Sequence, residues 1–456
     1  MRSSKLLFWP LVFLALPAQA QGTAEASISS GDTAWMLVAT ALVLLMTPAL
    51  AFFYGGLVRA KNALNTMMMS FIALGISGVL WAVLGYSLAF GEGSAWIGDF
   101  SKVLLMGVGL EPSGSIPHLL FMAFQGTFAI ITAALISGAI VERMQFKAYL
   151  WFIGLWGLLV YAPIAHWVWG GGWLADLGAL DFAGGAVVHV NAAAAAIGAV
   201  LFLGPRRDYG RQAMLPHNVP FVLLGAGLLW FGWFGFNGGS ALASNESAAL
   251  AFVNTMLAPA ATLSAWAFLD LIRSGKVTAV GAATAIVVGL VAITPAAGFV
   301  PPWAALLIGA LSALPSYFAI LWRPRTRFDD SLDVFAAHGL GGASGALLTG
   351  VFAHAAWNGT ADGLLFGNPG QVLVQLLSVV AVLFYSSVVS FLILKVLSLF
   401  MPVRAAAPDE ARGLDVVLHG EEAYAYGEGA VLLLEHERAN GTAPATAPRP
   451  QPATTA

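Results

Sequence analysis

Two histidines stand out because each lies in an apolar run, eight residues after an aspartate. His189 follows Asp181 in DFAGGAVVHVN, and His338 follows Asp330 in DDSLDVFAAHGLGG. Ionisable side chains inside lipid are costly and are functional candidates by default. Two neutral imidazoles that meet can hydrogen-bond each other and pass a proton between them. The repeated spacing therefore predicts a proton-relay site built from His189 and His338.

A buried histidine taken alone is more often a packing residue bonded to a backbone carbonyl. We place four others in that class or at interfaces: His118, His166, His217 and His354. Eight residues of helix span about 12 Å, so Asp181 is too far along the chain to pair with His189. We expect it to cap the helix N-terminus at the outer mouth instead. A metal site is disfavoured, because two imidazoles without a carboxylate or thiolate at the same depth make an incomplete zinc site.

Aromatic side chains gather in three further segments, FQGTF, PIAHWVWGGGWL and WFGFNGGS. Aromatic residues near membrane ends usually anchor a helix at the interface or fill the core. Electron-rich ring faces beside a hydroxyl can instead attract a small cation. The candidates for such a site are Phe124, Phe128, Trp169, Trp233, Phe236 and Ser240.

The composition is that of a chain built for lipid: 59% of the residues are hydrophobic and 9% are charged. Soluble domains carry about 25% charged residues. The chain has no Cys, which excludes disulfides, thiolate metal sites and Cys nucleophiles. No GxxxxGK[ST] motif indicates an ATP-driven pump, and no basic tract indicates nucleic acid. We expect an all-α integral membrane protein.

Residues 1–20 resemble a cleavable signal peptide, with Arg2 and Lys5 before an apolar centre and Ala18-Gln19-Ala20 at its end. An uncleaved anchor helix is the alternative. Eleven apolar runs follow, beginning near Ala34, Asn65, Pro117, Ala148, Gly184, Pro220, Ser247, Val277, Pro302, Asp333 and Gln371. The loops after every odd-numbered run hold the Lys and Arg residues, and the alternate loops hold only Lys102. Cytoplasmic loops carry this excess, which predicts an outside N-terminus and a cytoplasmic C-terminus.

The span count also predicts the internal architecture. Five spans reverse the side of the chain, so a second five-span unit inserts upside down, and such inverted repeats place a site near the midplane at their interface. We expect an eleven-helix domain at about 30–400, with repeats at about 30–205 and 215–355 and a last helix at about 370–400. Residues 401–438 then form a cytoplasmic regulatory region, and the Ala/Pro/Thr-rich residues 439–456 a disordered tail.

These segments resemble the ammonium transporter family, the Amt/Mep/Rh group. The resemblance covers about residues 30 to 425 and is carried, in order, by FYGGLVRAKN, FQGTF, PIAHWVWGGGWL, DFAGGAVVH, WFGFNGGS, AALAFVNT, DVFAAHG and RGLDVVLHGEEAYA. The family resemblance implies eleven spans, a homotrimer in the cell membrane (inner or plasma) with one pore per subunit, and a possible cytoplasmic P-II-type regulatory partner. It implies no cofactor. Ser240 favours the bacterial Amt type over the Rhesus type.

The resemblance also implies roles for individual residues. Trp169, Phe128 and Ser240, with Phe124 nearby, match the outer ammonium-recruitment site. Phe128 and Phe236 match the stacked gate, His189 and His338 the twin histidines of the pore, and Trp233 a pore-lining aromatic. Asp181 matches an organising carboxylate near the recruitment site.

The expected function is therefore ammonium transport without enzymatic activity. Ammonium, or methylammonium as a further candidate, is recruited, deprotonated and conducted as ammonia, while its proton passes through the histidines. A bare cation is strongly disfavoured in an apolar pore, and no TVGYG-like potassium filter is present. The alternatives left open are an ammonium sensor with the same fold and a passive gas channel. A membrane enzyme is a more distant one, since no nucleophile–base pair stands out.

Overall fold

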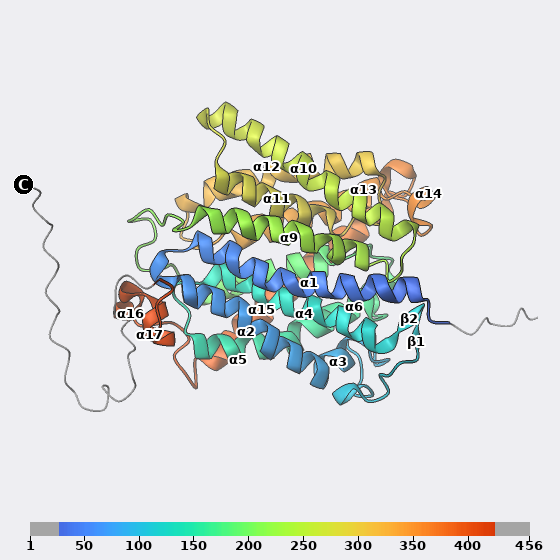
Figure 1. Cartoon of the computed structure of the whole chain (residues 1–456), viewed down its shortest axis with the longest axis horizontal. Coiled ribbons are helices and arrows are strands. Elements are labelled where there is room, and N and C mark those ends of the chain that lie inside the picture. Colours follow the sequence, from blue (N-terminus) through green and yellow to red (C-terminus); the bar gives the residue numbers. More distant parts are fainter. Residues whose placement is uncertain (1–26, 425–456) are drawn as a thin grey trace, which may run out of the picture.

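The computed structural model describes residues 27–424 as a bundle of helices that run roughly along one common direction (Figure 1). The expected signal peptide at 1–20 and the tail at 439–456 lie outside the described residues. So does the part of the expected regulatory region from residue 425 onward. The structure thus covers all of the apolar runs that follow the N-terminal segment.

The chain up to residue 205 forms eight α-helices, and several of them are joined through single π-helical turns. The α-helices are α1 (Ser30–Leu57), α2 (Ala63–Leu80), α3 (Tyr86–Phe90), α4 (His118–Ile140), α5 (Phe146–Trp156), α6 (Ala162–Trp169), α7 (Trp173–Asp176) and α8 (Asn191–Leu203). The π-helical turns are η2 (Trp81–Gly85), η4 (Gly157–Tyr161) and η5 (Gly185–Val190). Two 3₁₀ turns, η1 (Ala60–Asn62) and η3 (Val103–Leu105), and one short hairpin of β1 (Pro112–Ser113) and β2 (Ile116–Pro117) complete this part.

Residues 215–424 form nine α-helices, one π-helical turn and two 3₁₀ turns. The α-helices are α9 (Val219–Gly239), α10 (Glu246–Ser274), α11 (Ala279–Ile293), α12 (Pro302–Trp322), α13 (Gly341–Phe352), α14 (Ala355–Asn358), α15 (Gly370–Leu397), α16 (Ala407–Arg412) and α17 (Leu414–His419). The π-helical turn is η7 (Phe335–Leu340), and the 3₁₀ turns are η6 (Arg323–Arg325) and η8 (Leu364–Phe366).

Within residues 27–424, ten helical segments are long and apolar enough to cross a membrane. The eighth of the eleven expected runs forms a shorter helix, α11, of 15 residues. Its polypeptide continues past Ile293 into a buried turn at 294–300 rather than into further helix. A helix satisfies its backbone groups within one segment, which is why apolar runs of this length form helices in lipid.

Polar side chains fix where several of these helices begin. The side chains of Ser29, Asn218, Asn245 and Thr278 accept hydrogen bonds from backbone N–H groups in the first turns of α1, α9, α10 and α11. Such caps satisfy donors that have no partner inside the helix. At the other end of α10, Gly275 lies at φ 72°, where a residue without a Cβ is least strained.

The two parts of the chain are joined by packing and by the last long helix. Helix α1 packs along α9, and α15 packs against α8 and α13. Gln375 of α15 bonds to Leu180 N and O in the first part and to Ala346 O in the second. The hairpin β1–β2 and helix α14 lie at one end of the bundle, and α16 and α17 at the opposite end (Figure 1). We refer to these as the β1 end and the α16 end.

Candidate functional site

The structure brings His189 and His338 together in the interior. Their Nδ1 atoms are 3.2 Å apart, and the rings lie 5.3 Å apart between centroids at an interplanar angle of 25°. Both side chains are buried. At this distance one Nδ1 donates and the other accepts, so one hydrogen bond joins two residues that are 149 positions apart in the sequence.

Each histidine lies on a π-helical turn at the start of a long helix. His189 is in η5, which continues into α8, and His338 is in η7, which continues into α13. π-helical turns of this length are rare and often occur at functional sites, since the wider turn re-aims the side chain. The sequence pattern predicted helices here but gave no sign of these wider turns.

Asp181 organises the start of η5. Its two carboxylate oxygens accept hydrogen bonds from the backbone N–H groups of four consecutive residues, 184 to 187, at 2.5 to 3.1 Å. The two glycines in DFAGG are required by this turn. Gly184 lies at φ 114°, and a Cβ on Gly185 would meet Pro295 at 2.5 Å. Asp181 thus lies at the cap and makes no contact with the His189 ring.

Asp330 has the corresponding place before η7. Its Oδ2 accepts from the N–H of Phe335 at 2.6 Å. Nearby Asp333 forms an ion pair with Arg323 at 2.6 Å. Burial raises the pKa of Asp333 to about 7, although Arg323 works in the opposite direction. Asp333 and Arg323 line a cavity of about 150 Å³ that reaches His338 from the α16 end.

An aromatic stack lies on the other side of the histidine pair. The rings of Phe128 and Phe236 are 4.2 Å apart between centroids, and both are buried. Phe124 contacts Phe128 at 4.9 Å, and Trp169 meets it edge-on at 5.9 Å. The Phe236 ring lies 6.0 Å from that of His189. The rings therefore form a continuous series from Trp169 to the histidines.

Trp169 at one end of this series is half-buried, and so is Ser240, which directly follows the helix that carries Phe236. The Trp169 indole donates to the carbonyl of Asp181 at 2.9 Å, which ties the ring to the capped turn. The Ser240 hydroxyl donates to the carbonyl of Phe236 at 2.8 Å. A hydroxyl has one proton and two lone pairs, so Ser240 retains the capacity to accept a hydrogen bond from a cation such as ammonium.

Beside Phe236 and the two histidines the structure leaves a very small apolar space. The cavity measures about 10 Å³, and its lining consists of Met46, Leu50, Phe53, Ile131, Leu135, Val188, His189, Leu229, Trp233, Phe236, Val287 and His338. About this much space is needed for one water-sized molecule. A cation with its hydration shell does not fit, and apart from the histidines and the Trp233 indole the lining offers no polar side chain.

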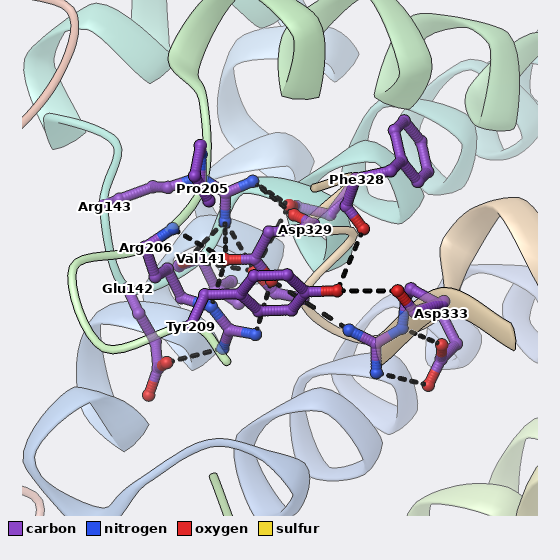
Figure 2. A network of polar contacts seen from close by, with 12 residues as sticks. Val141, Glu142, Arg143, Pro205, Arg206, Tyr209, Phe328, Asp329 and Asp333 are labelled. Carbon is purple, nitrogen blue, oxygen red and sulfur yellow. Dashed lines mark hydrogen bonds and ion pairs between the residues drawn. The ribbon is translucent and has the colours of Figure 1, made fainter. Parts of the chain in front are cut away.

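A network of buried charges lies at the α16 end, and sequence patterns gave no indication of its connectivity. Glu142 accepts a hydrogen bond from Arg59. It also accepts one from Arg206, and Arg206 pairs in turn with both oxygens of Asp329 (Figure 2). Burial acts to raise the pKa of Glu142, but Arg206 and Arg59 outweigh it and lower that pKa to about 2. The signal that could have found the network was the placement of these charges in loops directly beside apolar runs.

The segment after α15 contacts the same end. The guanidinium of Arg404 donates to the carbonyls of Leu203 and Pro205, at the end of the helix that carries His189. Asp415 accepts from the backbone N–H groups of Leu64 and Asn65 at the start of α2. Residues 401–424 are therefore docked on the helical bundle.

The other histidines are placed away from the pair. His166 and His217 bond to backbone carbonyls, and His118 bonds to Glu111 and Tyr86. His354 stacks on Phe366. Within residues 27–424 no group of three or more His, Asp or Glu side chains is arranged to hold a metal ion.

Fold and site together define a helical membrane protein with a buried histidine pair beneath an aromatic stack. The chain belongs to the Ammonium Transporter Family, whose model matches residues 34–424. It is 51% identical over 405 residues to an ammonium transporter of Aquifex aeolicus, covering 88% of this chain and 95% of that one. It is 47% identical over 399 residues to an ammonium transporter of Bacillus subtilis, covering 86% and 98%.

Solved structures show the same fold. The crystal structure of Saccharomyces cerevisiae Mep2 superposes with a TM-score of 0.79 at 36% identity, covering 84% of this chain and 89% of the other. A structure described as a sensor Amt protein superposes with a TM-score of 0.80 at 29% identity, covering 85% and 98%.

Proposed function

We propose that this chain transports ammonium across a cell membrane. Recruitment takes place at Trp169, Phe128 and Ser240, with Phe124 beside them. The observation that supports this placement is the half-buried Ser240 hydroxyl, which keeps acceptor capacity one helical turn after Phe236, whose ring lies against that of Phe128. Ring faces attract the ammonium cation, and the hydroxyl oxygen accepts a hydrogen bond from one of the N–H groups of that cation.

The passenger then loses its proton at the gate formed by Phe128 and Phe236. An apolar space of about 10 Å³ cannot replace the hydration shell of a cation. One N–H bond of ammonium breaks, its electron pair stays on nitrogen, and ammonia proceeds as a neutral molecule. Asp181 holds the capped turn in place and takes no part as a ligand of the passenger.

The proton travels separately, through His189 and His338. The single observation that carries the proposal is the 3.2 Å contact between their Nδ1 atoms beneath the aromatic gate. A proton accepted at one imidazole lets the shared proton move to the other, which releases a proton on the far side. Ammonia and the proton recombine after the pore, so each cycle moves one positive charge without ATP.

The architecture that we propose follows the same reasoning. Eleven spans, with α11 as the short eighth, form two inverted five-helix repeats at about 30–205 and 215–355 and a last helix at 370–400. The N-terminus lies outside after removal of the signal peptide, and the α16 end faces the cytoplasm, because the Lys and Arg excess lies there. Three copies assemble as a homotrimer in the bilayer.

Residues 401–438 are proposed to regulate the pore, with a P-II-type protein as a candidate partner. The supporting contact is that of Arg404 with the end of α8, the helix that carries His189. A partner that displaced residues 401–424 would remove these hydrogen bonds. The end of α8, which continues from the turn that carries His189, would then be held less firmly.

Electrical recording on proteoliposomes tests the transport proposal. An ammonium pulse is expected to give a transient inward current in vesicles that contain the full chain, and none in empty vesicles. Ammonia flux without current would favour a passive gas channel instead.

A sensor is the second candidate function, because one structural neighbour is described as a sensor Amt protein. A sensor binds ammonium at the recruitment site without passing it on. Binding measured by calorimetry, together with neither current nor ammonia flux in the same preparation, would favour the sensor.

A further inference from the structure

Trp233 touches both the gate and the histidine pair. Its indole lies 5.4 Å from the His189 ring at an interplanar angle of 21° and 5.3 Å from the Phe236 ring. The side chain is buried and lines the small apolar cavity between them. The orientation of this indole therefore affects which groups this small cavity presents to a passenger.

The orientation of Trp233 is set by Thr294. The indole Nε1–H donates to Thr294 Oγ1 at 2.8 Å, and the hydroxyl donates its own proton to the Leu290 carbonyl at 2.7 Å. Because a hydroxyl has one donor, the bond to Leu290 leaves a lone pair of Thr294 directed at the indole. Thr294 is completely buried at the end of α11.

The same turn also contacts the capped start of η5. The carbonyl of Pro295, next to Thr294, accepts from the N–H of Phe182 at 3.1 Å. The ring of Pro295 leaves no room for a side chain at Gly185. The buried turn at 294–300, where α11 ends, is thus held by two contacts. Thr294 bonds to the Trp233 indole, and Pro295 bonds to Phe182 in the segment that leads to His189.

An indole N–H that is released from Thr294 would be a buried donor without a partner, which is unfavourable. His189 Nε2 has no hydrogen-bond partner among the residues that the structure describes. In the tautomer in which Nδ1 of His189 donates to His338, Nε2 is an acceptor. The free indole donor and the passenger would then compete for the same atom.

We propose that Thr294 is a positioning residue of the pore. Its hydroxyl holds the Trp233 N–H away from the passage, so that Trp233 presents only its ring face and His189 Nε2 stays available to the passenger. This inference rests on the proposed conduction path and adds to it a residue that lies outside the path.

The test compares Thr294→Val, which keeps the shape and loses the hydroxyl, with Thr294→Ser, which keeps the hydroxyl. In proteoliposomes, Thr294→Val should lower the maximal ammonium current by about five- to tenfold, the loss expected for one hydrogen bond. The half-saturating concentration should change by less than about twofold, because recruitment precedes this point. Thr294→Ser should restore most of the current.

A matched control removes another buried hydroxyl. The Thr262 side chain donates to the carbonyl of Ala258 and bonds to Gly309 of α12. Neither of these hydrogen-bond partners belongs to the aromatic series, so Thr262→Val should leave the current within about twofold of the wild type.

A second readout does not need transport. The full chain is labelled with 5-fluorotryptophan, and the Trp233 signal is assigned by its loss in Trp233→Phe. Fluorine resonance should show this signal shifted or broadened in Thr294→Val and unchanged in Thr294→Ser. If the wild type carries no current, the conduction proposal fails, and the fluorine experiment still decides the role of Thr294.

Two outcomes would overturn the inference. One is a Thr294→Val protein with wild-type current and an unchanged Trp233 signal. The other is equal loss in Thr294→Val and Thr294→Ser, which would assign the effect to the turn and not to the hydroxyl. If Thr294→Val fails to fold, the pair Trp233→Phe and Trp233→Phe/Thr294→Ala replaces it. Equal currents in these two variants would support the inference that Thr294 acts through the Trp233 indole. A further large loss of current in the double variant would overturn that inference.

Discussion

The Nδ1 atoms of His189 and His338 lie 3.2 Å apart, although 149 positions separate the two residues in the chain. Each ring belongs to a different π-helical turn, η5 before α8 or η7 before α13, and the contact exists only because the two parts of the chain fold against each other. The pair is the one point in the described residues at which a proton could pass between those two helices through side chains alone.

Replacing either histidine should change what the pore conducts. In His189→Asp or His338→Asp the shared proton is lost and a carboxyl stands in the apolar passage. Ammonium-specific current should fall by about tenfold or more, the effect of losing a positioned proton carrier. His118→Gln, at the β1 end, serves as the control. Unaltered, ammonium-selective current in His189→Asp would remove His189 from the relay.

Removing the Ser240 hydroxyl should weaken recruitment and leave conduction nearly intact. One hydrogen-bond acceptor is worth about 1 to 2 kcal/mol, a factor of about 5 to 30 in half-saturating ammonium. The maximal current of Ser240→Ala should stay close to that of the wild type. Thermal unfolding of the same preparation checks that the fold is intact. A reduced maximum at unchanged half-saturation would place Ser240 in the conduction step instead.

Asp181 should matter for stability more than for ammonium binding. Its carboxylate accepts four backbone N–H bonds. In Asp181→Ala these buried donors lose their acceptor, which we expect to cost about 2 to 3 kcal/mol of unfolding free energy. Asp176→Asn, an exposed position on α7, is the matched control. Wild-type melting of Asp181→Ala would show that the cap is dispensable.

The network around Glu142 should make the protein sensitive to acid at the α16 end. The pKa of Glu142 is about 2, below its ordinary value of 4.5. A carboxyl with a lowered pKa contributes stability above its unfolded pKa and loses it as pH falls from about 4.5 towards 2, for a total of about 3 kcal/mol. Glu142→Gln should remove this pH dependence, which unfolding at a series of pH values measures. As a control, Glu92→Gln, at an exposed position, should leave this pH dependence in place.

The sequence predicted the long apolar helices well, because their length and composition depend on the bilayer and not on tertiary contacts. It also predicted that Asp181 and His189 would occupy different places, since eight residues of helix separate them. The short α11 was harder to predict. Its run is as apolar as the others, and it ends early at Thr294 and Pro295, a turn that is stabilised by contacts with Trp233 and Phe182.

The remaining features depend on partners that are distant in the chain. The π-helical turns at both histidines and the network of Glu142, Arg206 and Asp329 leave no periodic signal in the sequence. The roles of the recruitment residues came from family resemblance, and the structure adds their distances. The ion-pair partners lie in separate loops, so they can be identified only from a structure that shows which loops are neighbours.

The single hydrogen bond between two Nδ1 atoms has a direction. When a proton enters at one ring and another leaves from the second, the bond ends with its donor and acceptor exchanged. The proposed relay could then accept no second proton from the same side until both imidazoles return to their first tautomers. Turnover would therefore be limited by this reset, and in deuterated water the current should slow more than a neutral ammonia flux.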